Sequence, residues 1–158
     1  MLGYYKNHDA TAKYFHTDEN GNVWACTGDM GYVTEDGSVY VDGRISDSYT
    51  NAQGETIYLF DIERAVLGAD SVRQCRAVAS EINGKITHVA HTVLDNEVSQ
   101  DGALKQIHDL CKNRLKPNHL PTLFKFYKDA LPVAPSGKLD VAKMKNNTEN
   151  IVEYNVKV

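Results

Sequence analysis

The sequence predicts a small mixed α+β domain, a short sheet with two to three helices, preceded by a few β-strands. Apolar residues recur at helical spacing in two segments of the chain. Two further apolar segments flank an Asn-Gly pair, the strongest short-range signal for a β-hairpin. The first forty-odd residues differ from the rest, because closely spaced turn signals separate very short apolar segments.

The N-terminal part of the chain is predicted to form two or three short antiparallel strands joined by tight turns. Its apolar segments are Val23–Cys26, Gly31–Val33 and Val39–Val41, and turn residues such as Asn20-Gly21 and Asp36-Gly37 stand between them. Strands this short bury little apolar surface and are marginally stable alone. We therefore expect them to be the end of a larger sheet.

From about residue 44 the pattern changes to one of helices mixed with longer strands. Ile57–Leu67 carries apolar residues at helical spacing and acidic residues early in the segment, where the helix dipole favours them. Ala77–Ile82 and Lys85–Leu94 are predicted as the strands of the hairpin around Asn83-Gly84.

The C-terminal part adds a second helix, a strand, a loop and a short final helix. Ser99 is predicted to cap a helix that runs through Leu115 and ends at Lys116-Pro117, since proline disfavours helical geometry in the residue before it. The remaining elements are a strand at Leu123–Lys128, a loop at Pro132–Lys138 and a helix at Val141–Asn146.

Composition and charge exclude several classes of protein. The chain has 158 residues, of which 42% are hydrophobic, so it is long and apolar enough for a core without disulfides. The formal net charge is −4, which argues against a general nucleic-acid-binding surface. We expect no transmembrane segment and no secretory signal, because no apolar run is long enough. Three widely spaced cysteines without a Cys-x-x-Cys pair indicate a reduced, cytoplasmic protein.

Two patterns suggest metal sites, but ordinary structure explains both better. His88 and His91 are three residues apart on a predicted strand, so they point to opposite faces. Asp18 to Asn22 faintly resembles a calcium loop, but it lacks the glycine and the distal glutamate that such loops need. We predict a hairpin turn there, and no metal site in the chain.

Three short motifs carry the chemical information. They are Thr27-Gly28-Asp29, then Gly43-Arg44 followed by Asp47, and finally Pro135-Ser136-Gly137-Lys138. Taken singly, each has a simpler explanation: a common tight turn, a surface turn with a charge pair, and a flexible loop with a solvated lysine. Their order and spacing make them far more specific in combination.

Together, the motifs resemble the C-terminal end of the adenylate-forming (AMP-binding) enzyme superfamily, most of all acyl-CoA synthetases. The resemblance extends along nearly the whole chain. The segment from Gly3 to Phe15 is similar to a GYxxxxxxT stretch, and the first two motifs to a TGD…DG…GR series. Gly54-Glu55 with Ile62-Glu63 is similar to the family's G…IE segment, and the last motif to its terminal PxGK loop.

This resemblance implies an AMP-forming acid–thiol ligase. A carboxylate attacks the α-phosphate of ATP, which is bound with Mg²⁺, and coenzyme A then displaces AMP to form a thioester. At the matching positions, Asp29 would accept hydrogen bonds from the ribose hydroxyls, and Arg44 would donate to ribose or phosphate oxygens. Lys138, a compact cation on a loop freed by Gly137, would bridge the carboxylate and the α-phosphate during adenylation.

The resemblance also implies a domain organisation. Residues 1–43 would be the terminal strands of a large adenylation domain, residues 44–47 a hinge and residues 48–158 a mobile lid. Asp47 is the best match to the hinge acid on one family spacing, and Ser46 on another. The partner of the chain is then the missing large domain of the same polypeptide, which holds the phosphate loop and the acyl pocket. Alone, the chain is expected to be inactive.

The substrate and the acceptor stay open at this point. The GRxxD spacing favours a long-chain fatty or otherwise bulky carboxylic acid. One alternative is an adenylation domain that loads a carrier-protein thiol instead of coenzyme A. Another is a stand-alone, non-catalytic interaction module that has kept the fold, although the presence of Asp29, Arg44 and Lys138 argues against it.

Overall fold

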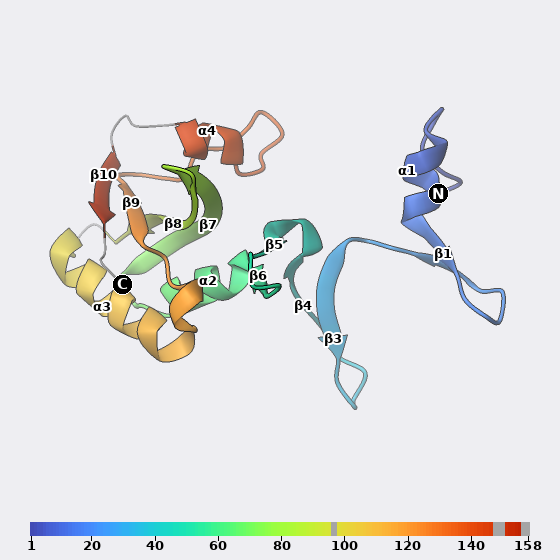
Figure 1. Ribbon diagram of the computed structural model, residues 1–158, viewed down its shortest axis with the longest axis horizontal. Helices are drawn as coiled ribbons and strands as arrows, with labels where there is room; N and C mark the ends of the chain where they lie inside the picture. The colour runs from blue at the N-terminus through green and yellow to red at the C-terminus, as the bar shows by residue number, and fades with distance from the viewer. Residues whose placement is uncertain (96–97, 147–150, 156–158) are drawn as a thin grey trace. The chain divides into compact units, whose positions relative to one another are not determined.

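Two structural units, divided between Ser48 and Tyr49, make up the computed structural model of the chain (Figure 1). The structure describes residues 1–95, 98–146 and 151–155. Within these ranges no helix is both long and apolar enough to cross a membrane. The small α+β fold predicted from the sequence is confirmed.

The first unit consists of a short helix and two hairpins. Its strands form two antiparallel pairs, β1 with β2 and β3 with β4; the strands at β2, β3 and β4 were predicted, whereas β1 was not. The helix was not predicted, because it carries no apolar stripe; Asn7 caps it by accepting a hydrogen bond from the Ala10 amide at 3.0 Å. The elements are α1 (His8–Tyr14), β1 (Phe15–Thr17), β2 (Val23–Ala25), β3 (Asp29–Val33), β4 (Val39–Arg44) and the 3₁₀ helix η1 (Ile45–Asp47).

The turn between β1 and β2 is organised by one carboxylate. Asp18 accepts hydrogen bonds from the Trp24 indole at 2.9 Å, from the Asn22 side chain and amide, and from the Asn20 amide. These donors lower the pKa of Asp18 to about 2, with Trp24 contributing most. The predicted hairpin turn is confirmed. N–H groups of Asn20 and Asn22, within the turn, donate hydrogen bonds to both carboxylate oxygens of Asp18.

The first unit has no hydrophobic core. None of residues 1–48 is buried. The β3–β4 hairpin exposes apolar side chains from consecutive residues, so both of its faces are uncovered. They include the stacked rings of Tyr32 and Tyr40, 5.2 Å apart, together with Val33, Val39 and Val41. Burial within the unit therefore contributes little to its stability.

The second unit is built on a four-stranded sheet with the strand order β10-β9-β8-β7. The β8–β9 pair is parallel, and the other two pairs are antiparallel. The predicted hairpin is confirmed: Asn83 and Gly84 both have positive φ, 53° and 73°, as a two-residue type I′ turn requires. The strands are β7 (Val72–Ile82), β8 (Lys85–Leu94), β9 (Leu123–Tyr127) and β10 (Ile151–Asn155).

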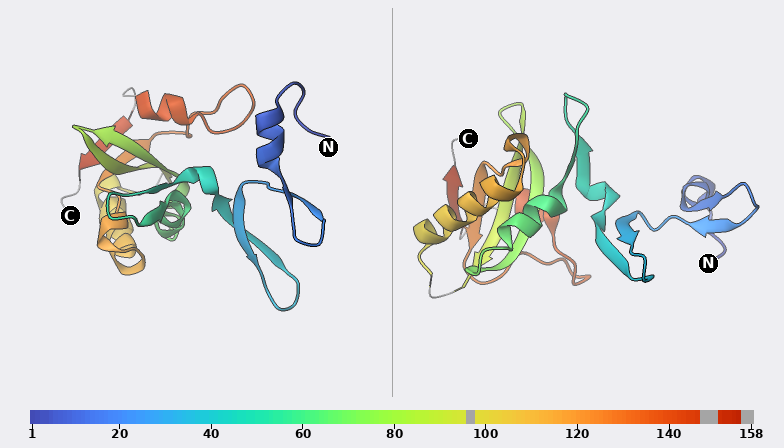
Figure 2. Two further views of the ribbon diagram at one scale, coloured as in Figure 1. Left: turned by 45° about the vertical axis from the view of Figure 1, so that its right-hand side comes forward. Right: turned by 90° about the horizontal axis from the view of Figure 1, so that it is seen from below.

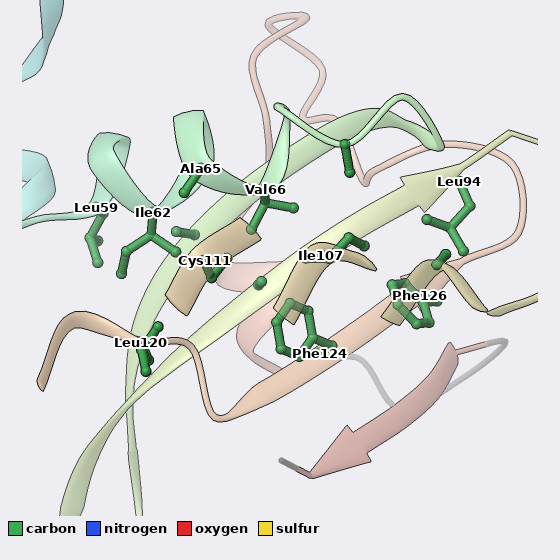
Figure 3. Packing of buried hydrophobic residues seen from close by; sticks show 14 residues of the cluster. Leu59, Ile62, Ala65, Val66, Leu94, Ile107, Cys111, Leu120, Phe124 and Phe126 are labelled. Atoms are coloured by element: carbon green, nitrogen blue, oxygen red, sulfur yellow. The ribbon is translucent and has the colours of Figure 1, made fainter. Parts of the chain in front are cut away.

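Helices α2 (Leu59–Val66) and α3 (Gln100–Arg114) cover one face of this sheet (Figures 1 and 2). Ser99 caps α3 as predicted, accepting from the Gly102 amide at 3.3 Å. The α2 helix starts at Leu59, later than predicted, because Thr56–Tyr58 forms strand β6. The core between helices and sheet is shown in Figure 3; its fully buried members include Ile62, Val66, Ile107, Cys111 and Phe124.

The opposite face of the sheet carries a smaller apolar cluster. There, helix α4 (Val141–Asn146), predicted with these bounds, buries Met144 against Val93, Tyr127 and Leu131. The four-stranded sheet is therefore covered on both faces, and its core lies entirely within the second unit.

Candidate functional site

The two residues predicted to bind the nucleotide form one exposed ion pair. Asp29 begins β3, Arg44 ends β4, and the two residues are partners in the antiparallel register. The Arg44 Nε lies 2.8 Å from Asp29 Oδ1, and its Nη1 donates to the Thr27 carbonyl at 3.0 Å. The TGD turn and the GR pair, fifteen residues apart in sequence, are thus one locus.

Two glycines allow this approach. Gly28 has a φ of +76°, a left-handed conformation that side chains disfavour, and it turns the chain into β3. A Cβ on Gly31 would lie 2.1 Å from the Tyr40 carbonyl oxygen, so only glycine permits the close pairing beside the bulge at Met30/Gly31. The bulge and the turn together place Asp29 opposite Arg44.

The ion pair is accessible to a ligand. The side chains are 35% exposed for Asp29 and 58% for Arg44, and an ion pair in this setting contributes little to stability. Each group therefore loses little free energy when it exchanges its partner for a ligand. The carboxylate is an acceptor for hydroxyl groups, and the guanidinium is a planar donor suited to phosphate oxygens.

The predicted hinge residues Ser46 and Asp47 lie in η1, between β4 and strand β5 (Ser48–Thr50). The Ile45 amide donates to the Gly28 carbonyl at 2.9 Å, and the Ser48 hydroxyl donates to the Ile45 carbonyl at 2.7 Å. This 3₁₀ turn stands directly before the division between the two units. Short 3₁₀ segments have weaker hydrogen-bond geometry than α-helices.

Lys138 lies in the second unit, on a tight, hydrogen-bonded loop. The Ala134 amide donates to the Lys138 carbonyl at 2.8 Å, and the Gly137 amide to the Ala134 carbonyl at 2.9 Å. Gly137 has a φ of +79° and closes the turn. The predicted loop is confirmed; it is a hydrogen-bonded turn, and Lys138 is exposed on it.

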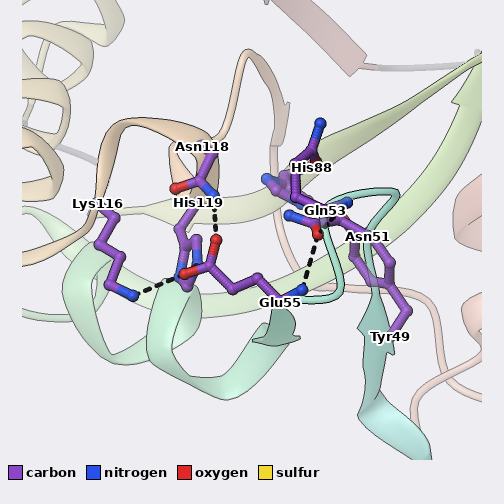
Figure 4. A network of polar contacts seen from close by, with 8 residues as sticks. All are labelled: Tyr49, Asn51, Gln53, Glu55, His88, Lys116, Asn118 and His119. Atoms are coloured by element: carbon purple, nitrogen blue, oxygen red, sulfur yellow. Dashed lines mark hydrogen bonds and ion pairs between the residues drawn. The ribbon is translucent and has the colours of Figure 1, made fainter.

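A polar network that the sequence did not predict joins the β5–β6 hairpin to the segment after α3 (Figure 4). Glu55 Oε1 lies 2.6 Å from Lys116 Nζ and 3.2 Å from His119 Nε2, and Asn118 Nδ2 donates to Glu55 Oε2. The hairpin pairs β5 with β6 (Thr56–Tyr58), and the partners of Glu55 flank or form the 3₁₀ turn η2 (Pro117–His119). The only sequence signal was the Gly54-Glu55 pair.

Beside this network lies an open pocket of about 680 Å³. Glu55, Lys116 and His119 form part of its lining, and Arg64 and Arg114 add two further cations. Apart from the Glu55–Lys116 pair, the charged side chains of the lining are Arg64, Arg114 and one carboxylate, Asp61.

The two histidines of the HxxH pattern have separate partners on opposite faces of β8. His88 contacts the Tyr49 hydroxyl and the Leu120 carbonyl, whereas His91 Nδ1 lies 2.8 Å from the Tyr127 hydroxyl. Burial is the main cause that lowers the pKa of His91 to about 4, so its ring is neutral near pH 7. Within the described ranges, no three potential metal ligands cluster together.

Several curated proteins with similar sequences are CoA ligases. The chain is 36% identical over 141 residues to a 2-succinylbenzoate–CoA ligase of Bacillus velezensis, which covers 88% of this chain and 26% of that protein. It is 32% identical to a D-alanine–D-alanyl carrier protein ligase of Staphylococcus epidermidis (90% and 29%). A long-chain-fatty-acid–CoA ligase of Mycobacterium tuberculosis is 30% identical (77% and 24%).

Solved structures agree with these sequence matches. The O-succinylbenzoate coenzyme A synthetase of Bacillus subtilis, solved in complex with AMP, superposes with a TM-score of 0.67 and 29% identity. The match covers all of this chain and 29% of that one. No protein-family model matches the chain.

Sequence and fold together identify the class of protein. The chain is homologous to the C-terminal part of the adenylate-forming, AMP-binding superfamily, as its motifs predicted, and acyl- and aryl-CoA ligases are among its relatives. It spans about a quarter of the length of the curated relatives that it matches.

Proposed function

We propose that this chain is the C-terminal portion of an AMP-forming acid–thiol ligase. The ligase would activate a carboxylic acid with ATP and Mg²⁺ and transfer the acyl group from the adenylate to coenzyme A. The observation that carries the proposal is the Asp29–Arg44 ion pair, exposed at the motif positions in a chain homologous to CoA ligases over 88% of its length.

The proposed domain organisation has three parts. Residues 1–43 complete a large adenylation domain, residues 44–47 form the hinge with Ser46 or Asp47 as its pivot, and residues 48–158 form a lid. The uncovered apolar faces of the β3–β4 hairpin support this assignment, because they need a partner to exclude water from them. The quarter-length match to the relatives supports it independently. The isolated chain would then lack an acyl pocket and be inactive.

The proposed roles follow from the chemistry of the side chains. Asp29 accepts hydrogen bonds from the ribose hydroxyls, and Arg44 donates to ribose or phosphate oxygens. Lys138 enters with the lid and places its ammonium between the attacking carboxylate and the α-phosphate. There it offsets the repulsion of two anions and stabilises the negative charge that develops as the new bond forms. No residue of this chain is assigned to Mg²⁺.

The acyl substrate is proposed only as a carboxylic acid. The relatives' names include an aryl acid, D-alanine and long-chain fatty acids, so they give the long-chain preference no particular support. A panel of carboxylic acids tested on the full-length protein would decide it. Preference for acetate would overturn the idea of a bulky substrate.

A carrier-protein thiol is the second candidate acceptor. It is favoured by the 32% identity to a D-alanine–D-alanyl carrier protein ligase over 145 residues. Thioester formation with a phosphopantetheine-loaded carrier, and not with coenzyme A, would establish this alternative. We propose a cytoplasmic location for either enzyme, because Cys26, Cys75 and Cys111 form no disulfide bonds with one another.

The proposal is tested on the full-length protein that contains this chain. ATP–pyrophosphate exchange measures adenylation, and Lys138→Ala should lower its rate by roughly 10²- to 10³-fold. Thioester formation from a preformed acyl-adenylate should be retained, because that step does not use the lysine. Lys85→Ala removes an exposed lysine at the start of β8 and is the matched control.

The outcomes separate the alternatives. Pyrophosphate exchange that is insensitive to Lys138→Ala would remove the lysine from the mechanism. No exchange by the full-length protein with any acid would favour the non-catalytic module. Exchange by the 158-residue chain alone would contradict its proposed dependence on the large domain.

A further inference from the structure

We infer that Glu55 is a positioning residue that couples the β5–β6 hairpin to the body of the second unit, so that the two rotate as one piece. The inference rests on the proposed function, because it assigns this coupling to the movement of the lid between the two half-reactions.

The hairpin needs such a coupling because of its place in the fold. It follows the proposed hinge directly, so any rotation at residues 46–47 enters the lid through β5. Among the described strands, β5 and β6 pair only with each other and stay outside the four-stranded sheet. Backbone hydrogen bonds of the main sheet therefore do not fix the hairpin; its covalent continuation into α2 and its side-chain contacts do so.

Glu55 makes the most extensive of these side-chain contacts. Both of its carboxylate oxygens are used: Oε1 by Lys116 and His119, and Oε2 by Asn118 (Figure 4). The two donors, Lys116 and Asn118, are more than sixty positions from Glu55 in sequence. The hydrogen bond from Lys116 is the largest cause that lowers the pKa of Glu55 to about 2, so the carboxylate stays ionised in the working pH range.

The turn of the hairpin transmits what Glu55 fixes. Asn51 Oδ1 accepts from the Gln53 amide at 3.0 Å and from the Glu55 amide at 2.9 Å. The Asn51 amide in turn donates to the Glu55 carbonyl at 2.9 Å, and Gly54 takes the left-handed conformation at φ +79°. Holding Glu55 therefore holds the whole turn from Asn51 to Glu55.

Two further contacts hold the base of the hairpin but leave its tip to Glu55. The Tyr49 hydroxyl contacts His88 Nε2 on β8, and burial raises the pKa of Tyr49, which keeps it a neutral hydroxyl. The second contact is Ile57 on β6, whose side chain is buried within the second unit with 1% of its surface exposed. Without Glu55, the turn would sample orientations away from the body, and the fraction of lids aligned for the second half-reaction would fall.

The first test uses Glu55→Gln in the full-length protein, with each half-reaction measured separately. The glutamine keeps the shape of the side chain, but it removes the negative charge and places an NH₂ group where one carboxylate oxygen accepted a hydrogen bond. We expect the thioester step to slow by roughly threefold to tenfold, the effect of weakening a few partly exposed charged hydrogen bonds. Pyrophosphate exchange should stay within about twofold of wild type, since Lys138 lies on another loop. Glu81→Gln, on the exposed β7–β8 hairpin, is the control with equal loss of charge.

The second test measures hydrogen exchange in the 158-residue chain itself. The Gly54 and Glu55 amides should exchange roughly threefold to tenfold faster in Glu55→Gln, with no change at Phe124 in the core. Asn118→Ala should reproduce the effect from the other side. The double variant should be less impaired than the sum of the two singles, because both remove the same contact.

The results decide between coupling and a merely structural role. Equal loss of both half-reactions together with a lower melting temperature would overturn the inference, as would unchanged kinetics in an active enzyme. If the wild-type protein shows no pyrophosphate exchange, the proposed function fails. Faster hydrogen exchange of the hairpin amides in Glu55→Gln would then still support the coupling. Unchanged hydrogen exchange at these amides would refute it.

Discussion

Deleting residues 1–48 should leave the stability of the second unit almost unchanged. No residue in this range is buried, and all of the buried hydrophobic side chains in the described chain lie at or beyond Ile57. The deletion therefore removes none of the core. We expect the free energy of unfolding of the remaining domain to change by less than about 0.5 kcal/mol, as for ordinary surface changes.

A core substitution sets the scale for comparison. Ile62 is 0% exposed and packs in the cluster between α2, α3 and the sheet (Figure 3). Ile62→Ala should lower the free energy of unfolding by about 2–5 kcal/mol, because it removes buried methyl groups and leaves a cavity. For a domain of this size that corresponds to a loss of roughly 10 °C or more in melting temperature.

The assay uses two probes that report on different units. Far-UV circular dichroism in urea follows mainly the second unit, which contains helices α2, α3 and α4 and the four-stranded sheet. Trp24 is the only tryptophan and lies in the first unit, with 59% of its surface already exposed, so its fluorescence reports on that unit alone. We expect a cooperative unfolding transition by dichroism, with the same urea midpoint in the full 158-residue chain and in the chain without residues 1–48. In the full chain, the Trp24 fluorescence should change only slightly and gradually.

Two results would refute the reasoning. One is a deletion that lowers the midpoint as much as Ile62→Ala does. The other is a pair of coincident cooperative transitions by both probes, which would mean that the first unit folds with the second. In either case the proposal that the first unit depends on a missing large domain would lose its main physical argument.

Three further predictions concern single side chains. Asp29→Asn in the full-length protein should raise the KM for ATP by about tenfold, since it weakens charged hydrogen bonds to the ribose, whereas Asp9→Asn should not. The folded state holds the pKa of Glu55 near 2, below its ordinary 4.5. The stability from that network should therefore be complete above pH 4.5 and lost as the pH falls toward 2, with a flatter profile in Glu55→Gln. Burial depresses the pKa of His91 from 6.5 to about 4, so unfolding takes up a proton and the protein should lose stability, by about 2 kcal/mol, as the pH falls from 6.5 to 4. His91→Gln should reduce this loss in urea denaturation measured across that range.

Features set by neighbouring residues were predictable from the sequence. Asn83-Gly84 formed the expected hairpin turn, because both positions need positive φ and these residue types tolerate it. Ser99 capped its helix, and α4 has the predicted bounds, since caps and turns depend on a few adjacent side chains. The motifs pointed to the family for a related reason, because each combines particular residue types at a short spacing.

Elements set by distant contacts were not predictable in the same way. The α1 helix has no apolar stripe, so its cap alone signals it. The β10 strand is defined by its pairing with β9, from which it is separated by the Lys138 loop and α4. The sequence showed Asp29 and Arg44 as two separate motifs, and only the register of β3 and β4 made them one ion pair.

The sequence by itself determined the order of the main elements and the family, and it supplied the candidate site residues, because these depend on local patterns and short motifs. Only the tertiary structure decided which of these residues touch. Glu55 looked like a motif residue of no evident role, and its three partners lie more than sixty residues away. The absence of a core in residues 1–48 was likewise visible only once each side chain's exposure was known. Burial and long-range hydrogen bonds depend on the packing of the whole chain, which no window of neighbouring residues contains.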